Sequence, residues 1–157
     1  MKELRKEQKQ RLLLCSGSVF FWGLLAHAYG FLRCNLSHDV LNAFVATPRE
    51  EIWKLELGRF LVPVYRAIFR GPVTQPWLIG LLGLFWTALA LWLITRVFSM
   101  ESRVLVFLTA GILTTNITCI SQIATYLYEY DCNALALLLC VAAVYLWYRG
   151  GKVRFLV

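Results

Sequence analysis

Hydrophobic residues gather into four long runs that short charged segments separate. The runs cover about residues 12–32, 77–98, 104–127 and 133–148. An α-helix needs ~20 residues to cross the hydrocarbon core of a bilayer, and ~17 is the lower limit. The fourth run is slightly shorter than that limit and can extend at either end. This pattern predicts four transmembrane helices.

The segment between the first two runs, residues 33–76, has a different pattern. Thr47-Pro48-Arg49-Glu50 is typical of a helix start, with a capping residue followed by proline at the first helical position. Beyond it, apolar residues recur near helical spacing, with charged residues between them. This favours an amphipathic helix lying in the membrane interface. We expect Gly58 and Pro63 to divide it into two pieces.

Composition supports an all-α membrane protein with a single transmembrane domain over residues 1–157. Hydrophobic residues make up 59% of the chain and charged residues only 16%, and the mean hydropathy is +0.62. These values exclude an ordinary soluble domain. The net charge of +7 does not indicate a nucleic-acid partner, because the basic residues flank the apolar runs. The first run is too long for a signal-peptide core and is expected to be retained.

The charges at the ends of the runs predict an orientation. Basic residues precede the first run, bracket the second connection and follow the fourth run: Lys2, Arg5, Lys6, Lys9, Arg11, Arg96, Arg103, Arg149, Lys152 and Arg154. The connection after the third run has no Lys or Arg, only Glu129 and Asp131. The positive-inside rule then puts both termini in the cytoplasm. The segment 33–76 and the acidic connection face outward, although that segment carries six basic residues.

Asp39 is the leading candidate for chemistry, because it follows a helix exit and has His38 beside it. A carboxylate there can act as a general base towards a hydroxyl, but it can equally cap a short helix. Position alone favours the cap. His38 can orient Asp39, contact a phosphate or lie exposed at the interface. One His beside one Asp is a weak metal signature, so we predict no metal site.

The acidic connection and the third run supply a second set of candidates. Glu129 and Asp131 would point to opposite faces of a continuous helix, so they converge only if the chain there is non-helical. Asp131 is also a natural N-cap for the fourth helix. A polar stripe leads to this point through the third run: Thr115, Thr118, Gln122, Thr125 and Glu129. The stripe lines a wet cavity or forms hydrogen bonds between helices; the stripe alone favours the second.

The basic residues of the outer segment offer phosphate contacts. Guanidinium groups pair with phosphate in a two-pronged geometry, and Arg59, Arg66 and Arg70 are all candidates. Arg59 is the best of them, because Gly58 leaves room beside it. Generic attraction to anionic lipid is enough to explain Arg70. Cys34 and Cys132 both fall near the outer mouth, where a disulfide is chemically possible.

Five motifs together resemble the type II glucosyltransferase family of O-antigen modification. They are SHD at 37–39, LGRFLVP at 57–63, PWLIG at 76–80, GILTTN at 111–116 and DCNALAL at 131–137. The resemblance implies a polytopic glycosyltransferase of the GT-C type in the bacterial inner membrane. Such enzymes transfer a sugar from a polyprenyl-phosphate carrier to a glycan such as the O-antigen of lipopolysaccharide, on the outer face. It implies no particular cofactor.

The resemblance also assigns roles to residues. Asp39 would be the base, Glu129 and Asp131 would shape the acceptor or donor site, and Arg59 would face the carrier phosphate. His38, Arg66 and Gln122 are further candidate substrate contacts. Members of the family are several hundred residues long, so we expect the chain to match only their N-terminal part. A lipid-sugar flippase, an accessory subunit and an inactive remnant are the alternatives.

Overall fold

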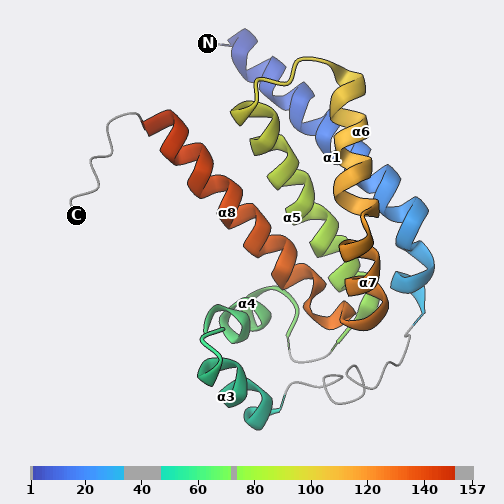
Figure 1. The fold of residues 1–157 in the computed structure, drawn as a ribbon, viewed down its shortest axis with the longest axis vertical. Coiled ribbons are helices and arrows are strands. Elements are labelled where there is room, and N and C mark those ends of the chain that lie inside the picture. The colour runs from blue at the N-terminus through green and yellow to red at the C-terminus, as the bar shows by residue number, and fades with distance from the viewer. Residues whose placement is uncertain (1, 34–46, 72–73, 151–157) are drawn as a thin grey trace.

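The described part of the chain is helical. The structure, a computed structural model, describes residues 2–33, 47–71 and 74–150, and no strand occurs among them. Five α-helices form a bundle: α1 (Lys2–Leu32), α5 (Pro76–Val97), α6 (Arg103–Thr115), α7 (Ile117–Thr125) and α8 (Tyr130–Gly150). Two short helices, α3 (Pro48–Glu56) and α4 (Leu61–Phe69), lie beside one end of it (Figure 1). The predicted all-α fold is confirmed.

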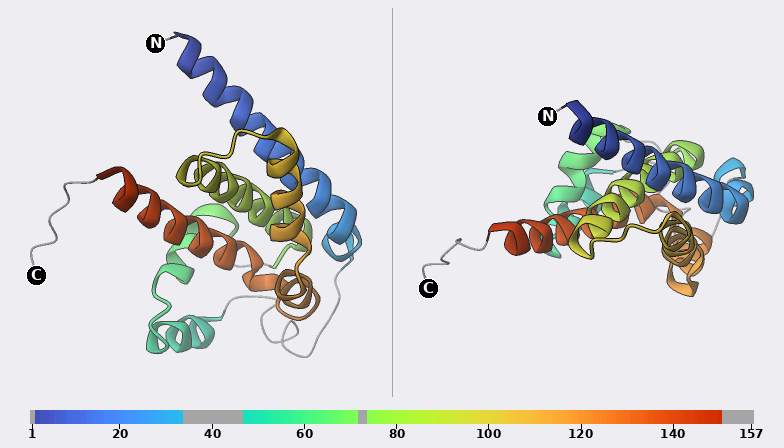
Figure 2. Two further views of the ribbon diagram at one scale, coloured as in Figure 1. Left: turned by 45° about the horizontal axis from the view of Figure 1, so that its top comes forward. Right: turned by 90° about the horizontal axis from the view of Figure 1, so that it is seen from above.

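Helix α5 is the centre of the bundle. It packs between α1 and α8, and α6 packs against α1 on the side that also faces α5 (Figure 2). The core consists of apolar side chains from these helices, including Val19, Leu84, Leu91 and Val106. Three helices are long and apolar enough to cross a membrane, and the α6–α7 pair is a fourth if it is one bent span. The protein is therefore a membrane protein of the predicted kind.

The sequence predicts one continuous helix for the third run, but the structure divides this run into α6 and α7. α6 and α7 meet at Asn116 with a bend of 41°. The Asn116 side chain serves both helix ends: its Oδ1 accepts from the amide of Cys119 at 2.9 Å, and its Nδ2 donates to the carbonyls of Ile112 and Leu113. Because one amide group satisfies backbone groups on both sides, the break leaves few polar groups unpaired.

The chain passes from α7 to α8 through a single 3-10 turn, η1 (Leu127–Glu129). α8 then begins at Tyr130, earlier than the predicted residue 133. The ring of Tyr130 lies where a methyl group on Gly83 would be, so glycine permits this close approach to α5. Asp131 consequently lies in the first turn of α8, and the prediction that it is the N-cap was wrong.

The predicted helix start at Thr47 is confirmed, because its Oγ1 accepts from the amide of Glu50 at 3.3 Å. The predicted break at Gly58 is also present: this glycine has φ = 75°, in the left-handed region that other residues avoid. The prediction of a break at Pro63 was wrong. Pro63 lies in the first turn of α4, where a missing amide hydrogen has no helical partner to lose.

α3 and α4 are amphipathic with an unusual orientation. Their basic residues Lys54 and Arg66 are buried against the bundle, whereas apolar residues such as Ile52, Leu61 and Ile68 are exposed. In Figure 1 these helices share the lower end of the bundle with α7, η1 and the start of α8. We call this the site end. An outward apolar face is suited to contact with lipid.

Candidate active site

Lys54 is the centre of an ion-pair network at the site end. Lys54 is 0% exposed, although α3 is a short helix outside the bundle. Its Nζ lies 3.0 Å from Glu50 Oε1, one turn earlier in α3, and 3.0 Å from Glu129 Oε1 in η1. The ammonium group also lies over the Tyr128 ring, 5.4 Å from its centroid. A lysine is buried this completely only when carboxylates compensate its charge.

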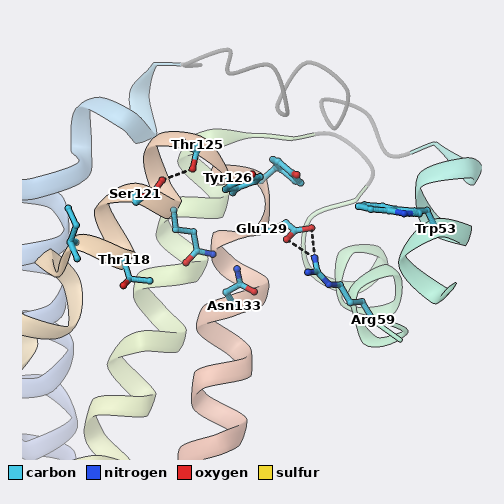
Figure 3. A pocket seen from close by; sticks show the side chains of 11 residues that line it. Trp53, Arg59, Thr118, Ser121, Thr125, Tyr126, Glu129 and Asn133 are labelled. Atoms are coloured by element: carbon cyan, nitrogen blue, oxygen red, sulfur yellow. Dashed lines mark hydrogen bonds and ion pairs between the residues drawn. The ribbon is translucent and has the colours of Figure 1, made fainter. Parts of the chain in front are cut away.

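Arg59 is the second cation on Glu129. Its Nη1 lies 3.1 Å from Glu129 Oε2 (Figure 3), and half of the Arg59 side chain is exposed. Glu129 is thus held by one buried and one accessible cation. A negatively charged ligand can reach Arg59 from solvent, whereas it cannot reach Lys54.

Glu50 connects the two short helices. Its Oε1 accepts from Lys54 and also from Arg66 Nη1 in α4, at 3.1 Å. Burial opposes ionisation of Glu50, but the hydrogen bonds from the two cations outweigh it and lower its pKa below the usual value. Arg66 is buried, and its Nε and Nη2 have no hydrogen-bond partner. The candidate phosphate contact Arg66 therefore faces Glu50 inside the network.

Arg70 contacts Tyr128, one residue before Glu129, and Asp131, two residues after it. It donates through Nη2 to the carbonyl oxygen of Tyr128, and its Nε lies 3.3 Å from Asp131 Oδ2. Asp131 is fully buried, so Glu129 and Asp131 do not converge on one ligand. The turn of η1 continues into α8, and the two carboxylates pair with different cations. Generic attraction to lipid, our explanation of Arg70, was therefore wrong.

An open cavity of about 740 Å³ lies beside the Glu129–Arg59 pair. Its lining residues come from α3, the link between α3 and α4, α7, η1 and the first turn of α8: Trp53, Arg59, Ile117, Thr118, Ser121, Gln122, Thr125, Tyr126, Tyr128, Glu129 and Asn133. The predicted polar stripe thus lines a cavity from Thr118 onwards. Thr115 is the exception: it does not line the cavity, and its hydroxyl donates to the Gly111 carbonyl within α6. We call this space the polar cavity (Figure 3).

A smaller groove of about 300 Å³ adjoins the polar cavity. Most of its lining is apolar and comes from the start of α4 and one face of α8: Gly58, Arg59, Phe60, Leu61, Val62, Tyr65, Glu129, Cys132, Asn133, Leu135, Ala136 and Leu139. Arg59, Glu129 and Asn133 line both spaces. We call this space the apolar groove. The Arg59–Glu129 pair is therefore the boundary between a polar and an apolar compartment.

A comparison with protein families matches residues 28–157 to the family described as Glucosyl transferase GtrII. The chain belongs to this family. No curated protein and no solved structure matched it significantly. The resemblance seen in the five motifs is confirmed, and membership supports a glucosyl-transferase-type function for this membrane protein.

Some of the residues that the sequence predicts for the site are not among those that the structure describes. His38, Asp39 and Cys34 lie outside the described residues, and Cys132 is a free thiol. Within the described ranges, no group of three His, Cys, Asp or Glu side chains is placed to hold a metal ion.

Sequence reasoning missed Lys54, Glu50 and Tyr126. The helix-start motif assigns Glu50 to the cap of an amphipathic helix. The spacing of charged residues assigns Lys54 to the polar face of that helix. One signal in the sequence could have identified Lys54, namely the six basic residues of a segment predicted to face outward. A basic side chain that is buried needs an acidic partner, and Glu129 and Asp131 are the only acidic residues of the facing connection.

We expect Arg70→Lys to loosen the η1 turn without unfolding the bundle. Lysine keeps a positive charge for Asp131 but cannot also donate to the Tyr128 carbonyl as the guanidinium does. Loss of one such hydrogen bond costs about 1 kcal/mol, so hydrogen exchange at residues 127–131 should accelerate about fivefold. Arg103→Lys, an exposed site at the opposite end, is the control. Unchanged exchange in the Arg70 variant would contradict this role.

Proposed function

We propose that this GtrII-family protein transfers a glucosyl group from a polyprenyl-phosphate carrier to a cell-surface glycan such as O-antigen. The reaction would occur at the outer face of the bacterial inner membrane. One observation supports this best: the Arg59–Glu129 pair stands where the apolar groove meets the polar cavity. A lipid-linked sugar has the same division, with an apolar chain and a polar sugar joined by a phosphate.

In this proposal the prenyl chain lies in the apolar groove. Phe60 and Leu61 form one wall and Leu135 and Leu139 of α8 form the other. Leu139 and the residues beyond it on α8 are largely exposed, so a long chain can continue along the helix into the bilayer. Burial of apolar surface supplies the affinity, at about 25 cal/mol per Å².

Arg59 would hold the carrier phosphate. A half-exposed guanidinium can pair with phosphate through two N–H groups, while Glu129 keeps its second partner, Lys54. When the bond between the anomeric carbon and the phosphate oxygen breaks, negative charge increases on the phosphate. A cation fixed at that point stabilises the leaving group in the transition state.

Asp39 would be the general base, a role that rests on the family resemblance. It would take the proton from the acceptor hydroxyl as that oxygen attacks the anomeric carbon, and His38 would orient it. Gln122 would contact a sugar hydroxyl. Asp131 and Arg66 are buried in the network and would support Glu129 and Arg59 rather than touch substrate. The site end would face outward, since Arg96, Arg103 and Arg149 lie at the other end of the bundle.

Arg59→Gln should weaken donor binding with little effect on folding. A hydrogen bond to a charged partner contributes about 1.5–3 kcal/mol, so the KM for polyprenyl-phosphate glucose should rise roughly 10- to 100-fold. The measurement is transfer to acceptor glycan in proteoliposomes at varied donor concentration. Arg49→Gln, an exposed arginine in α3, is the matched control. An unchanged donor KM in the Arg59 variant would remove the phosphate role.

A further inference from the structure

We propose that Trp53 and Tyr126 form a stacking platform for a sugar ring of the acceptor glycan. This inference rests on the proposed function and extends it to the second substrate. The two rings line the polar cavity but not the apolar groove. Figure 3 shows Trp53 on the α3 side and Tyr126 on the α7 side of the Arg59–Glu129 pair.

The chemistry of this wall suits a carbohydrate. Trp53 is 52% exposed and Tyr126 is 46% exposed, so part of each residue is available for contact. One face of a pyranose ring presents C–H groups, which are attracted to the negative face of an aromatic ring. The hydroxyl groups at the sugar's edge need donors and acceptors, and the cavity provides them in Ser121, Gln122 and Asn133.

Gln122 adds an independent observation. Its Nε2 is buried and has no hydrogen-bond partner, although a buried amide normally finds one. The side chain lines the same cavity as the two aromatic rings. A sugar hydroxyl in the cavity would be an acceptor for this group, so an apolar ligand would fit the site less well than a polyhydroxylated one.

Exposed aromatic residues near a membrane are often interfacial anchors. We therefore compare Trp53 with Trp77, another exposed tryptophan at the site end. Trp77 opens α5 at the same end of the bundle and is 51% exposed. It lines neither the polar cavity nor the apolar groove. The two tryptophans are almost equally exposed, but only Trp53 lines the cavity together with polar residues of α7. Trp77 is therefore the reference for an interfacial anchor.

The acceptor, rather than the donor, is the better match for this platform. The donor sugar is tied to the phosphate at Arg59 and so lies at the boundary with the groove. Trp53 and Tyr126 line the polar cavity alone and have no part in the boundary with the groove. A glycan polymer requires an open cavity of this kind, because the rest of its chain must remain outside the site.

Direct binding tests the platform without catalysis. Soluble O-polysaccharide released from lipopolysaccharide is titrated against the full chain in nanodiscs, by calorimetry. Trp53→Ala and Tyr126→Ala should each weaken binding about tenfold, whereas Trp77→Ala should bind like the parent. Equal affinity in all four proteins overturns the proposal, and so does an absence of binding by the parent.

Kinetics then separate the platform from the proposed function. In the transfer assay, Trp53→Ala should raise the acceptor KM about tenfold and leave the donor KM unchanged. A change in the donor KM alone overturns the assignment to the acceptor. If the parent binds the polysaccharide through Trp53 but transfers no sugar, the platform is supported and the proposed transferase reaction is refuted.

Discussion

Replacing Lys54 by methionine should release α3 from the bundle and reduce sugar transfer below detection. Methionine has a similar length but leaves Glu50 and Glu129 each without one of their cations, in a place where Lys54 is 0% exposed. Removing one partner of a buried ion pair costs about 3 kcal/mol or more. Few other contacts join α3 to the bundle, so the helix should detach rather than adjust.

Hydrogen exchange and proteolysis measure this effect. Amides of residues 48–60 should exchange faster and a protease should cut there, while α5 and α8 stay protected. Arg49→Met is the matched control, because it removes a positive charge from the same helix at an exposed position. Native-like protection of α3 in the Lys54 variant would show that the ion pairs do not hold it.

Replacing Asp39 by asparagine should lower the rate of transfer by about 10²- to 10⁴-fold, the usual contribution of a general base. Asparagine has nearly the same shape but cannot accept the proton of the acceptor hydroxyl. Donor binding should be unchanged, since the phosphate is held by Arg59 in the proposed site. The measurement is initial rate in membranes supplied with polyprenyl-phosphate glucose and acceptor glycan.

Asp131→Asn is an instructive contrast. Asp131 is buried against Arg70, so its replacement should destabilise the protein and lower transfer through a loss of folded material. Asp39→Asn should instead lower transfer at an unchanged yield of inserted protein. Equal transfer by the Asp39 variant and the parent rules out the catalytic role. If the parent moves the lipid-linked sugar across the bilayer without consuming it, the flippase alternative replaces the transferase.

The membrane helices could be predicted because hydropathy is a local property. The predicted second crossing, 77–98, differs from α5 (Pro76–Val97) by one residue at each end. The break at Asn116 could not be predicted in this way. The third run continues through Asn116 without a charged residue, and the bend depends on how one side chain divides its hydrogen bonds between two helices.

The candidate site was predictable only in part. Glu129 was identified from its isolated position in a connection without basic residues, and Arg59 from its glycine neighbour. The burial of Lys54 could not be predicted, because its partner Glu129 is 75 residues away. No local pattern distinguishes a buried lysine from a solvated one. Asp131 was misread for the same reason, since Arg70 determines its environment. The roles of His38 and Asp39 stay predictions.

The inward-facing charges of α3 and α4 also impose an order of assembly. Glu129 is synthesised 75 residues after Lys54, a delay of roughly 4 to 15 seconds at ~5–20 residues per second. During that interval Lys54 has only Glu50 as a counterion, and Arg70 has no Asp131. We therefore expect the two helices to stay loosely held at the hydrated membrane surface during this interval. Synthesis of η1 and the first turn of α8 supplies Glu129 and Asp131, so we expect the site to form only when these elements have been made.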